Sequence, residues 1–206
     1  MDLLELLLKR RSIRKYTEEK ISEDKLEKIL QAGLLAFSGR NLKPWEFVVV
    51  REKETIQKMA QARKAGAGML TGADCAIVVF GNPQTSDTWV EDCSIAMTSM
   101  HFMATELGVG SCWIQGRMRE AADGRSTEEF VKELLQVPEH YKLEAILSLG
   151  MPEKEEKPHN LEELVWEKVQ FVSEDTPLSD EIGAIMRANK SIEENGLVSY
   201  DEVDWS

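Results

Sequence analysis

The chain has 206 residues, 42% of them hydrophobic and 30% charged, a balance typical of one mid-sized globular domain. Its formal net charge of −12 disfavours nucleic acid or an anionic membrane as partner, because such partners select basic surfaces. No apolar run reaches the ~18 residues that span a bilayer, and the amino-terminal residues lack the pattern of a signal peptide. We therefore expect a cytoplasmic protein without a membrane or nucleic-acid partner.

Helices and strands are expected to alternate through the first half of the chain. Asp2 and Glu5 have the spacing of a capping box, in which the two side chains bond the first turn of a helix. A second helix is expected after Ser22, where apolar residues recur at intervals of three and four. The other elements expected here are strands at residues 47–50 and 76–80, with a helix around Ile56 and Met59 between them.

A long helix is expected at residues 90–107. Its apolar side chains form an unusually wide stripe, made by Cys93, Ala96, Met97, Met100, Met103, Ala104 and Leu107. A helix with so wide an apolar arc is buried on more than one side, in a core or in a subunit interface. Glu91 and Asp92 at its start are expected to favour the positive end of the helix.

The last part of the core is expected to hold two strands, at residues 111–114 and 143–149. Between them, Ser126 and Glu129 have capping-box spacing ahead of an apolar run, which predicts a helix. Strands and helices mix throughout the chain, so its class is α/β or α+β, in three layers around one sheet.

The composition changes near the end of the chain. A charged, turn-rich stretch follows Pro152, and an acidic segment with one short helix, near residues 182–186, follows Val172. We therefore expect a domain of residues 1–172 and an acidic C-terminal extension of residues 173–206.

Several common sites are disfavoured. The three cysteines form no C-x-x-C pair and are expected to be small buried hydrophobes. The three histidines are His101, His140 and His159; no two have metal-ligand spacing, so no metal is expected. The run Gly108-Val109-Gly110 lacks the third glycine of a dinucleotide fingerprint, and no G-x-S-x-G elbow supports a hydrolase.

A basic cluster in this acidic protein is the strongest local feature. It consists of Lys9, Arg10, Arg11, Arg14 and Lys15, with Ser12 among them. A phosphomonoester needs several guanidinium groups and a hydroxyl donor, and Arg10 and Arg14 would project from one side of a helical turn. Alternatively, the cluster is a favourable basic cap on the negative end of the first helix.

A second feature is the loop Ser38-Gly39-Arg40-Asn41-Leu42-Lys43-Pro44-Trp45, directly before a strand. An asparagine in such a loop can hydrogen-bond the edge of a planar heterocycle, and Pro44 would stiffen the segment. Alternatively, it is an ordinary turn at the start of a strand, with Trp45 as a core anchor.

Four segments together resemble the nitroreductase family, in order and spacing. They are residues 10–16, the loop with Ser38, Asn41, Pro44 and Trp45, residues 106–114 after the long helix, and residues 147–152 after the last strand. The resemblance covers about residues 1–172. It implies an α+β fold in three α/β/α layers with a central, mostly antiparallel sheet, and a homodimer that holds FMN across its interface.

The resemblance also implies the residues that hold FMN, with no catalytic side chain, because the cofactor performs the hydride chemistry. Arg10, Ser12 and Arg14, with Arg11 adjacent, would take the phosphate and ribityl chain. Ser38 and Asn41 would approach from the partner subunit, and Cys112, Trp113, Leu149 and Gly150 would lie along the isoalloxazine. Lys157 and His159 are candidates for a basic pair on the phosphate. Lys43 stands where the family often has Gln, and would either favour the reduced flavin or point to solvent.

The implied activity is electron transfer from NADH or NADPH to a small organic acceptor such as a nitroaromatic, a quinone or an activated alkene. Donor and acceptor would react in turn, in a ping-pong mechanism. One alternative is a non-catalytic flavin-binding or sensing protein whose acidic tail docks a partner. Another is a protein that binds polyanions through residues 9–15.

Overall fold

The structure is a computed structural model that describes residues 2–169. The chain divides into two units, Met1–His159 and Asn160–Ser206. In the described part of the second unit there are two short 3₁₀ turns, Leu161–Glu163 and Trp166–Lys168. The expected helix near residues 182–186 and the extension at residues 173–206 lie outside the described residues. Within residues 2–169, no helix is both long enough and apolar enough to cross a membrane.

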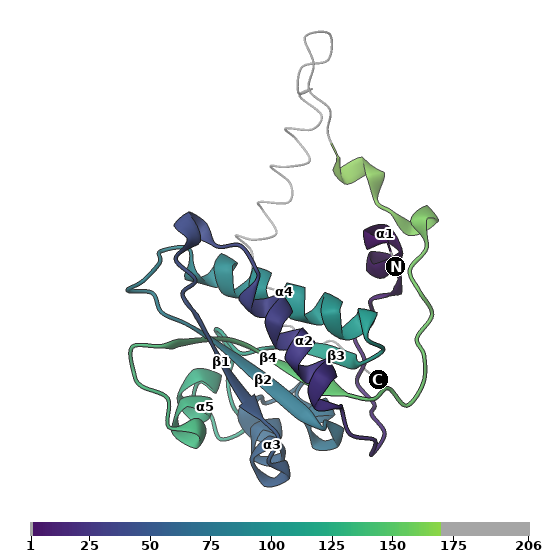
Figure 1. Ribbon diagram of the computed structural model, residues 1–206. Coiled ribbons are helices and arrows are strands. Elements are labelled where there is room, and N and C mark those ends of the chain that lie inside the picture. The colour runs from purple at the N-terminus through teal and green to yellow at the C-terminus, as the bar shows by residue number, and fades with distance from the viewer. Residues whose placement is uncertain (1, 170–206) are drawn as a thin grey trace, which may run out of the picture. The chain divides into compact units, whose positions relative to one another are not determined.

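A four-stranded antiparallel sheet forms the centre of the first unit (Figure 1). Its strands are β1 (Trp45–Val50), β2 (Cys75–Gly81), β3 (Gly110–Gln115) and β4 (Lys142–Gly150). The order is β1-β2-β4-β3, so β1 and β3 are the edges. The expected antiparallel sheet is confirmed, and each strand lies where its apolar run predicts it.

Helices cover both faces of the sheet, which makes three layers. One face carries α2 (Glu23–Leu34) and α4 (Trp89–Glu106), and the other carries α3 (Lys53–Met59) and α5 (Thr127–Leu135). Successive residues of β2 alternate between the two cores: Ile77 packs beneath α2 and α4, whereas Val78 packs beneath α3 and α5. The whole of β2 is therefore buried. The α+β class in three layers is confirmed.

The long helix α4 is buried on more than one side, as its apolar pattern predicts. The fully buried residues of its stripe are Cys93, Ala96, Met97, Met100 and Ala104. Gly33 of α2 lies directly against Met100, because a Cβ on this glycine would come within 2.8 Å of the Met100 Cγ atom. This close approach packs α2 on α4.

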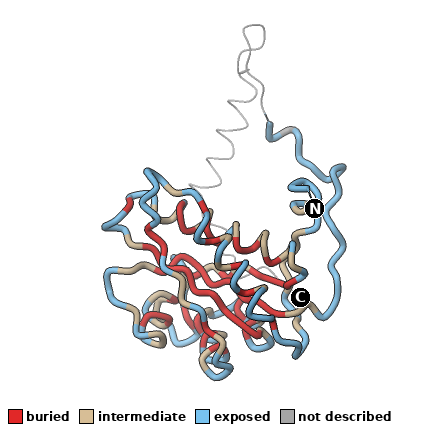
Figure 2. Tube along the Cα trace, in the orientation of Figure 1, coloured by how far each residue is buried: buried red, intermediate tan, exposed pale blue. Residues whose placement is uncertain are grey.

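The first helix, α1 (Leu3–Lys9), begins with the expected capping box of Asp2 and Glu5 but buries none of its residues. Figure 2 shows this helix as exposed for the most part, with some residues of intermediate burial. Leu3 and Leu4 keep 65% and 53% of their surface accessible. More apolar side chains are exposed beyond the end of α2, where Leu35 and Phe37 are 83% and 73% accessible. Among residues 2–169, large apolar side chains are therefore left uncovered.

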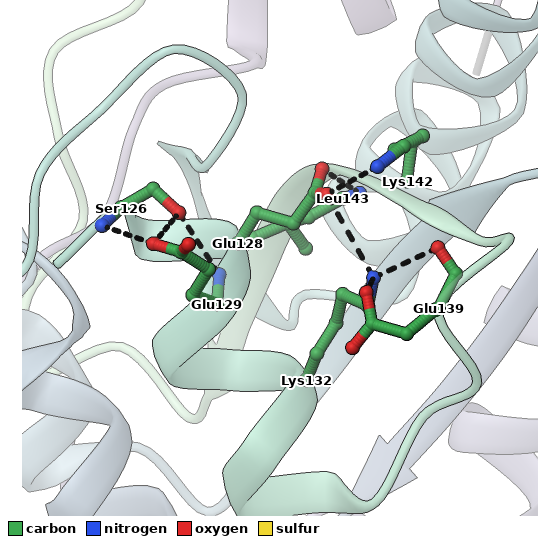
Figure 3. Close-up of polar contacts among 7 residues, drawn as sticks. All are labelled: Ser126, Glu128, Glu129, Lys132, Glu139, Lys142 and Leu143. Atoms are coloured by element: carbon green, nitrogen blue, oxygen red, sulfur yellow. Dashed lines mark hydrogen bonds and ion pairs between the residues drawn. The ribbon is translucent and has the colours of Figure 1, made fainter.

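Charged side chains tie α5 to the start of β4 (Figure 3). The Glu128 carboxylate accepts hydrogen bonds from the Leu143 backbone N–H at 3.1 Å and from the Lys142 ammonium at 3.0 Å. The buried ammonium of Lys132 donates to the carboxylate of Glu139 at 2.8 Å and to the carbonyl of the same residue at 2.9 Å. These bonds satisfy a lysine that would otherwise be buried without a partner.

Candidate functional site

The basic segment does not continue the first helix. Helix α1 ends at Lys9, and Arg10 is extended, with φ −61° and ψ 121°. The expectation that Arg10 and Arg14 share one side of a helical turn is therefore wrong. The same grouping arises differently, because alternate residues of an extended segment point to the same side. Arg10, Ser12 and Arg14 are such alternate residues.

Backbone hydrogen bonds hold this segment beside the sheet. The Ile13 N–H donates to the Ser111 carbonyl of β3 at 2.9 Å, and the Thr17 N–H donates to the Met151 carbonyl just after β4 at 2.8 Å. The Ile13 side chain lies on Gly110, where a Cβ would come within 2.8 Å of its Cγ2 atom. The segment is thus fixed by partners that are distant in sequence.

Tyr16 forms a second anchor of the segment. Its ring covers Gly150, whose Cβ, if it had one, would lie 2.6 Å from the Tyr16 Cγ atom. Its hydroxyl lies 2.8 Å from the Ser148 Oγ atom and donates to the Ile13 carbonyl at 2.7 Å. Burial raises the pKa of this phenol, so it stays protonated. Gly150 is therefore required by packing, in addition to its expected place beside a flavin.

One side of the segment carries Arg10, Ser12 and Arg14, and this side lies near the Cys112 thiol of β3. Burial raises the pKa of this thiol, while the charge of Arg14, a hydrogen bond with Ser12 and the charge of Arg10 oppose that rise. All three side chains therefore act on one buried atom. The structure brings together four of the predicted site residues: Arg10, Ser12, Arg14 and Cys112.

His101 of α4 also reaches this cluster. It is 7% exposed, and its Nε2 atom lies 3.4 Å from an Nη1 atom of Arg10. Its Nδ1 atom bonds the Ser111 hydroxyl. Burial, and then the charge of Arg10, lowers the pKa of His101 to about 4. From the sequence alone, His101 was considered only as a candidate metal ligand. A titratable residue inside the apolar arc of α4 was the signal that could have identified it as part of the site.

Arg11 lies on the other side of the segment. Its guanidinium donates to the Lys157 carbonyl, and the His159 N–H donates to the Leu8 carbonyl at 2.8 Å. Arg11 and Ile13 line a cavity of about 570 Å³ bounded by α1, the start of β3 and residues 152–158. The contacts of Lys157 and His159 with this region are made by their backbones, so the roles of their side chains stay predictions.

The Ser38 loop is anchored at the first turn of α4. The buried Asp92 carboxylate accepts from the Gly39 N–H at 2.8 Å, from the Ser86 hydroxyl at 3.1 Å and from the Thr88 hydroxyl at 3.2 Å. The Ser38 hydroxyl accepts from the Lys43 N–H at 2.9 Å. Asp92 thus does more than favour the helix end, because it fixes this loop.

The loop itself has a constrained backbone. Arg40, Asn41 and Lys43 have positive φ angles of 51°, 57° and 48°, a conformation that non-glycine residues adopt only when their surroundings hold them. Asn41 and Lys43 are exposed, whereas Trp45 is buried at 6% and stacks on Phe47 with ring centroids 6.3 Å apart. Trp45 is therefore the core anchor that the alternative interpretation proposed, while Asn41 is presented at the surface.

The basic cluster and the Ser38 loop lie at different ends of α4 (Figure 1). Asp92 holds the loop and His101 contacts Arg10, and these two residues are nine positions apart, about 13 Å along a helix. One chain therefore does not bring Ser38 and Asn41 to the basic cluster.

The characteristic sequence pattern of the nitroreductase family matches residues 7–67 and 61–151. The chain belongs to the nitroreductase family. An FMN-dependent nitroreductase from Clostridium difficile R20291 has a similar structure, with a TM-score of 0.81 and 42% identity over 83% of this chain and 99% of that chain. A protein of Archaeoglobus fulgidus, provisionally named NADH dehydrogenase/NAD(P)H nitroreductase, is 40% identical over 158 residues, which are 75% of this chain and 87% of that protein. The NADPH-flavin oxidoreductase of Vibrio harveyi is 27% identical over 165 residues, 73% of this chain and 66% of that protein.

Three further predicted residues line the sheet of this nitroreductase-family chain close to Cys112. The Leu149 side chain is buried in the core, and its carbonyl accepts from the Asp74 N–H at 2.9 Å. Gly150 pairs with Gly110 across the two strands. Trp113 is half-buried, and its indole N–H donates to the Gln115 side chain at 2.9 Å. The Leu149 side chain is buried and Gly150 has none, so contact of either residue with a flavin stays a prediction.

The nitroreductase-family chain keeps its cysteines as free thiols. Cys75, Cys93 and Cys112 are all buried, so the expectation of small buried hydrophobes is confirmed. Among the residues that the structure describes, no three His, Cys, Asp or Glu side chains are grouped to hold a metal ion.

Proposed function

We propose that this nitroreductase-family chain is an FMN-dependent oxidoreductase that takes electrons from NADH or NADPH and passes them to a small organic acceptor. The observation that carries the proposal is the convergence of Arg10, Ser12 and Arg14 on one side of a fixed extended segment, around Cys112. Two guanidinium groups and a hydroxyl suit a phosphomonoester, which carries nearly two negative charges.

The surroundings of this cluster also suit a flat, uncharged ring system. Gly110 and Gly150 pair at the adjoining ends of β3 and β4, where Ile13 and Tyr16 of the basic segment lie directly on them. On β3, Trp113 is half-buried on the α2–α4 face, and the neighbouring Cys112 is buried on the opposite face, so both would meet a flat ring mainly through backbone groups. The residues present thus fit FMN, with Arg10, Ser12 and Arg14 on the phosphate and ribityl chain, and Cys112, Trp113, Leu149 and Gly150 along the isoalloxazine. Arg11, Lys157 and His159 would add positive charge from the opposite side of the segment.

The site would be completed by a second copy of the chain. Ser38 and Asn41 are presented at the opposite end of α4 from the basic cluster, so they would serve the flavin of the partner subunit. The exposed leucines of α1, together with Leu35 and Phe37, supply apolar surface that such a dimer would bury. We therefore propose a homodimer with two equivalent flavin sites.

When bound, FMN supplies the two-electron chemistry that links nicotinamide to acceptor. The protein's part is to bind, to orient and to exclude water. We propose that donor and acceptor occupy one site in turn, which is a ping-pong order. Nitroaromatics, quinones and activated alkenes are the acceptor class. The three free thiols suit a reducing compartment, and we place the protein in the cytoplasm.

The purified protein tests this proposal directly. A visible absorption spectrum should show a flavin band, and anaerobic mixing with NADH or NADPH should bleach that band rapidly. A colourless protein that ignores added FMN would contradict the proposal. A bound flavin that neither nicotinamide reduces would instead indicate a non-catalytic flavin-binding or sensing protein.

A further inference from the structure

A buried histidine connects the basic segment to the sheet. His101 of α4 lies between Arg10, at 3.4 Å from its Nε2 atom, and the hydroxyl of Ser111 on β3, which contacts its Nδ1 atom. His101 is 7% exposed and Ser111 is 1% exposed. The carbonyl of Ser111 accepts the Ile13 N–H, so the residue that holds the ring also holds the basic segment.

The partners of His101 fix the position of its proton. A guanidinium has only donors, so the Nε2 atom must accept from Arg10. The proton is therefore on Nδ1, which donates to the Ser111 hydroxyl. Burial and the neighbouring charge of Arg10 keep the ring neutral near pH 7, because they lower the pKa of His101 to about 4.

A neutral acceptor has a consequence that a carboxylate would not have. It directs one of the five N–H groups of Arg10 without neutralising the positive charge of the guanidinium. A carboxylate in the same place would form an ion pair with Arg10 and compete with an incoming anion. Imidazole thus orients the guanidinium and leaves its charge for a ligand.

We propose that His101 is a positioning residue that orients Arg10 towards the phosphate of the bound cofactor. This inference rests on the proposed FMN site, and it adds a residue that makes no contact with the flavin itself. It assigns a role to a side chain outside the basic segment, through the pair of contacts made by its two ring nitrogens.

Two amide substitutions separate the two contacts. In His101→Gln the amide oxygen lies as many bonds from the backbone as Nε2, so it can still accept from Arg10. In His101→Asn the amide nitrogen replaces Nδ1, so it keeps the Ser111 contact and loses Arg10. Flavin fluorescence titration of the apoprotein should show FMN affinity within about threefold of wild type for H101Q and roughly tenfold weaker for H101N. His140→Asn, at an exposed histidine before β4, is the matched control.

The role through Arg10 is tested by a double-mutant cycle. In an Arg10→Ala background, H101N should cause no further loss of FMN affinity, because the group that it positions is absent. Riboflavin, which lacks the phosphate, should bind all variants alike. His101→Glu provides a second probe if H101N folds poorly, since its carboxylate should weaken FMN binding while riboflavin is unaffected.

The outcomes separate this inference from the proposed function. Wild-type protein that binds FMN while H101N, H101Q and H101E bind it equally well would overturn the role of His101 and leave the FMN site standing. Equal losses of FMN and riboflavin in H101N, or the same loss with and without Arg10, would show a merely structural histidine. Wild-type protein that fails to bind FMN would overturn both.

Discussion

The backbone N–H of Gly39 donates to the carboxylate of Asp92 at 2.8 Å, which joins the Ser38 loop to the first turn of α4. Asp92→Ala should lower the free energy of unfolding by about 1–3 kcal/mol, because it removes the buried carboxylate that accepts from the Gly39 N–H and from the hydroxyls of Ser86 and Thr88. Urea denaturation measures this loss. Glu91→Gln, at the exposed neighbouring position, is the control and should change stability little. An Asp92→Ala protein as stable as wild type would show that the loop has other anchors.

The basic cluster should discriminate FMN from riboflavin. Arg14→Ala and Arg10→Ala each remove a charge-assisted hydrogen bond to the phosphate, worth about 1.5–3 kcal/mol, or roughly a ten- to hundredfold loss of FMN affinity. Riboflavin affinity should hardly change. Fluorescence titration with both ligands measures the ratio, and Lys15→Ala, on the opposite side of the extended segment, is the matched control. Equal losses for the two flavins would mean that the cluster is structural.

The exposed leucines of α1 should be needed for dimerisation. Sedimentation of the wild-type protein should give a dimer with about one FMN per subunit. Leu4→Glu together with Leu7→Glu places charges on a helix that has no buried residue within the described part of the chain, and should favour monomers that have lost FMN. Met118→Glu, at a side chain that is 74% exposed elsewhere, should leave the dimer intact. A wild-type monomer that retains FMN would contradict the two-chain site.

A buried carboxylate should make stability depend on pH. Glu144 is 3% exposed, and within the described residues its Oε2 atom has no hydrogen-bond partner. Burial raises the pKa of Glu144 in the folded state, although the charge of Arg117 opposes the rise. The folded protein therefore holds this proton more tightly than the unfolded chain does, and the destabilisation grows as pH rises through the folded-state pKa.

Glu144→Gln should remove that destabilisation. The substitution should raise the free energy of unfolding at neutral pH by about 1 kcal/mol, and the gain should disappear below the ordinary glutamate pKa of about 4.3. Urea denaturation at several pH values measures the trend. A gain that is independent of pH would show that the carboxylate is not the cause.

Steady-state kinetics should give parallel double-reciprocal lines, with competition between nicotinamide and acceptor. One site must then serve both reactants in turn. Substitution of the exposed His140 or His159 should leave reduction by nicotinamide largely intact, although His159 would affect FMN affinity if its side chain reaches the phosphate. Intersecting lines would indicate a ternary complex. A histidine variant that keeps FMN but loses several orders of magnitude in reduction would reveal a catalytic group of the protein.

Local patterns predicted most of the fold. The capping boxes at Asp2 and Ser126 begin α1 and α5 as expected, since such caps depend on residues only three positions apart. The apolar arc of α4 predicted its broad burial for a similar reason. The strands lie at their apolar runs, because a short apolar run is a local signal of a strand buried in a sheet.

Features that depend on distant contacts could not be predicted in this way. Residues 10–14 were expected to turn helically, but the bond from the Ile13 N–H to the Ser111 carbonyl holds them extended. Nothing near Ile13 in sequence signals a partner on β3. The same holds for the contacts of Asp92 with Gly39 and of His101 with Arg10, which join residues far apart in the sequence. The four family segments named candidate site residues, of which the structure brings Arg10, Ser12, Arg14 and Cys112 together, while their mutual geometry required the tertiary structure.

The placement of the basic cluster and the Ser38 loop at opposite ends of α4 has a genetic consequence. In the proposed dimer, each flavin site takes its cations from one copy and its loop from the other. A chain defective in Arg14 and a chain defective in Asn41 would then be complementary alleles. When the two are expressed together, a mixed dimer gathers both defects at one site and leaves the other site with wild-type residues from both copies.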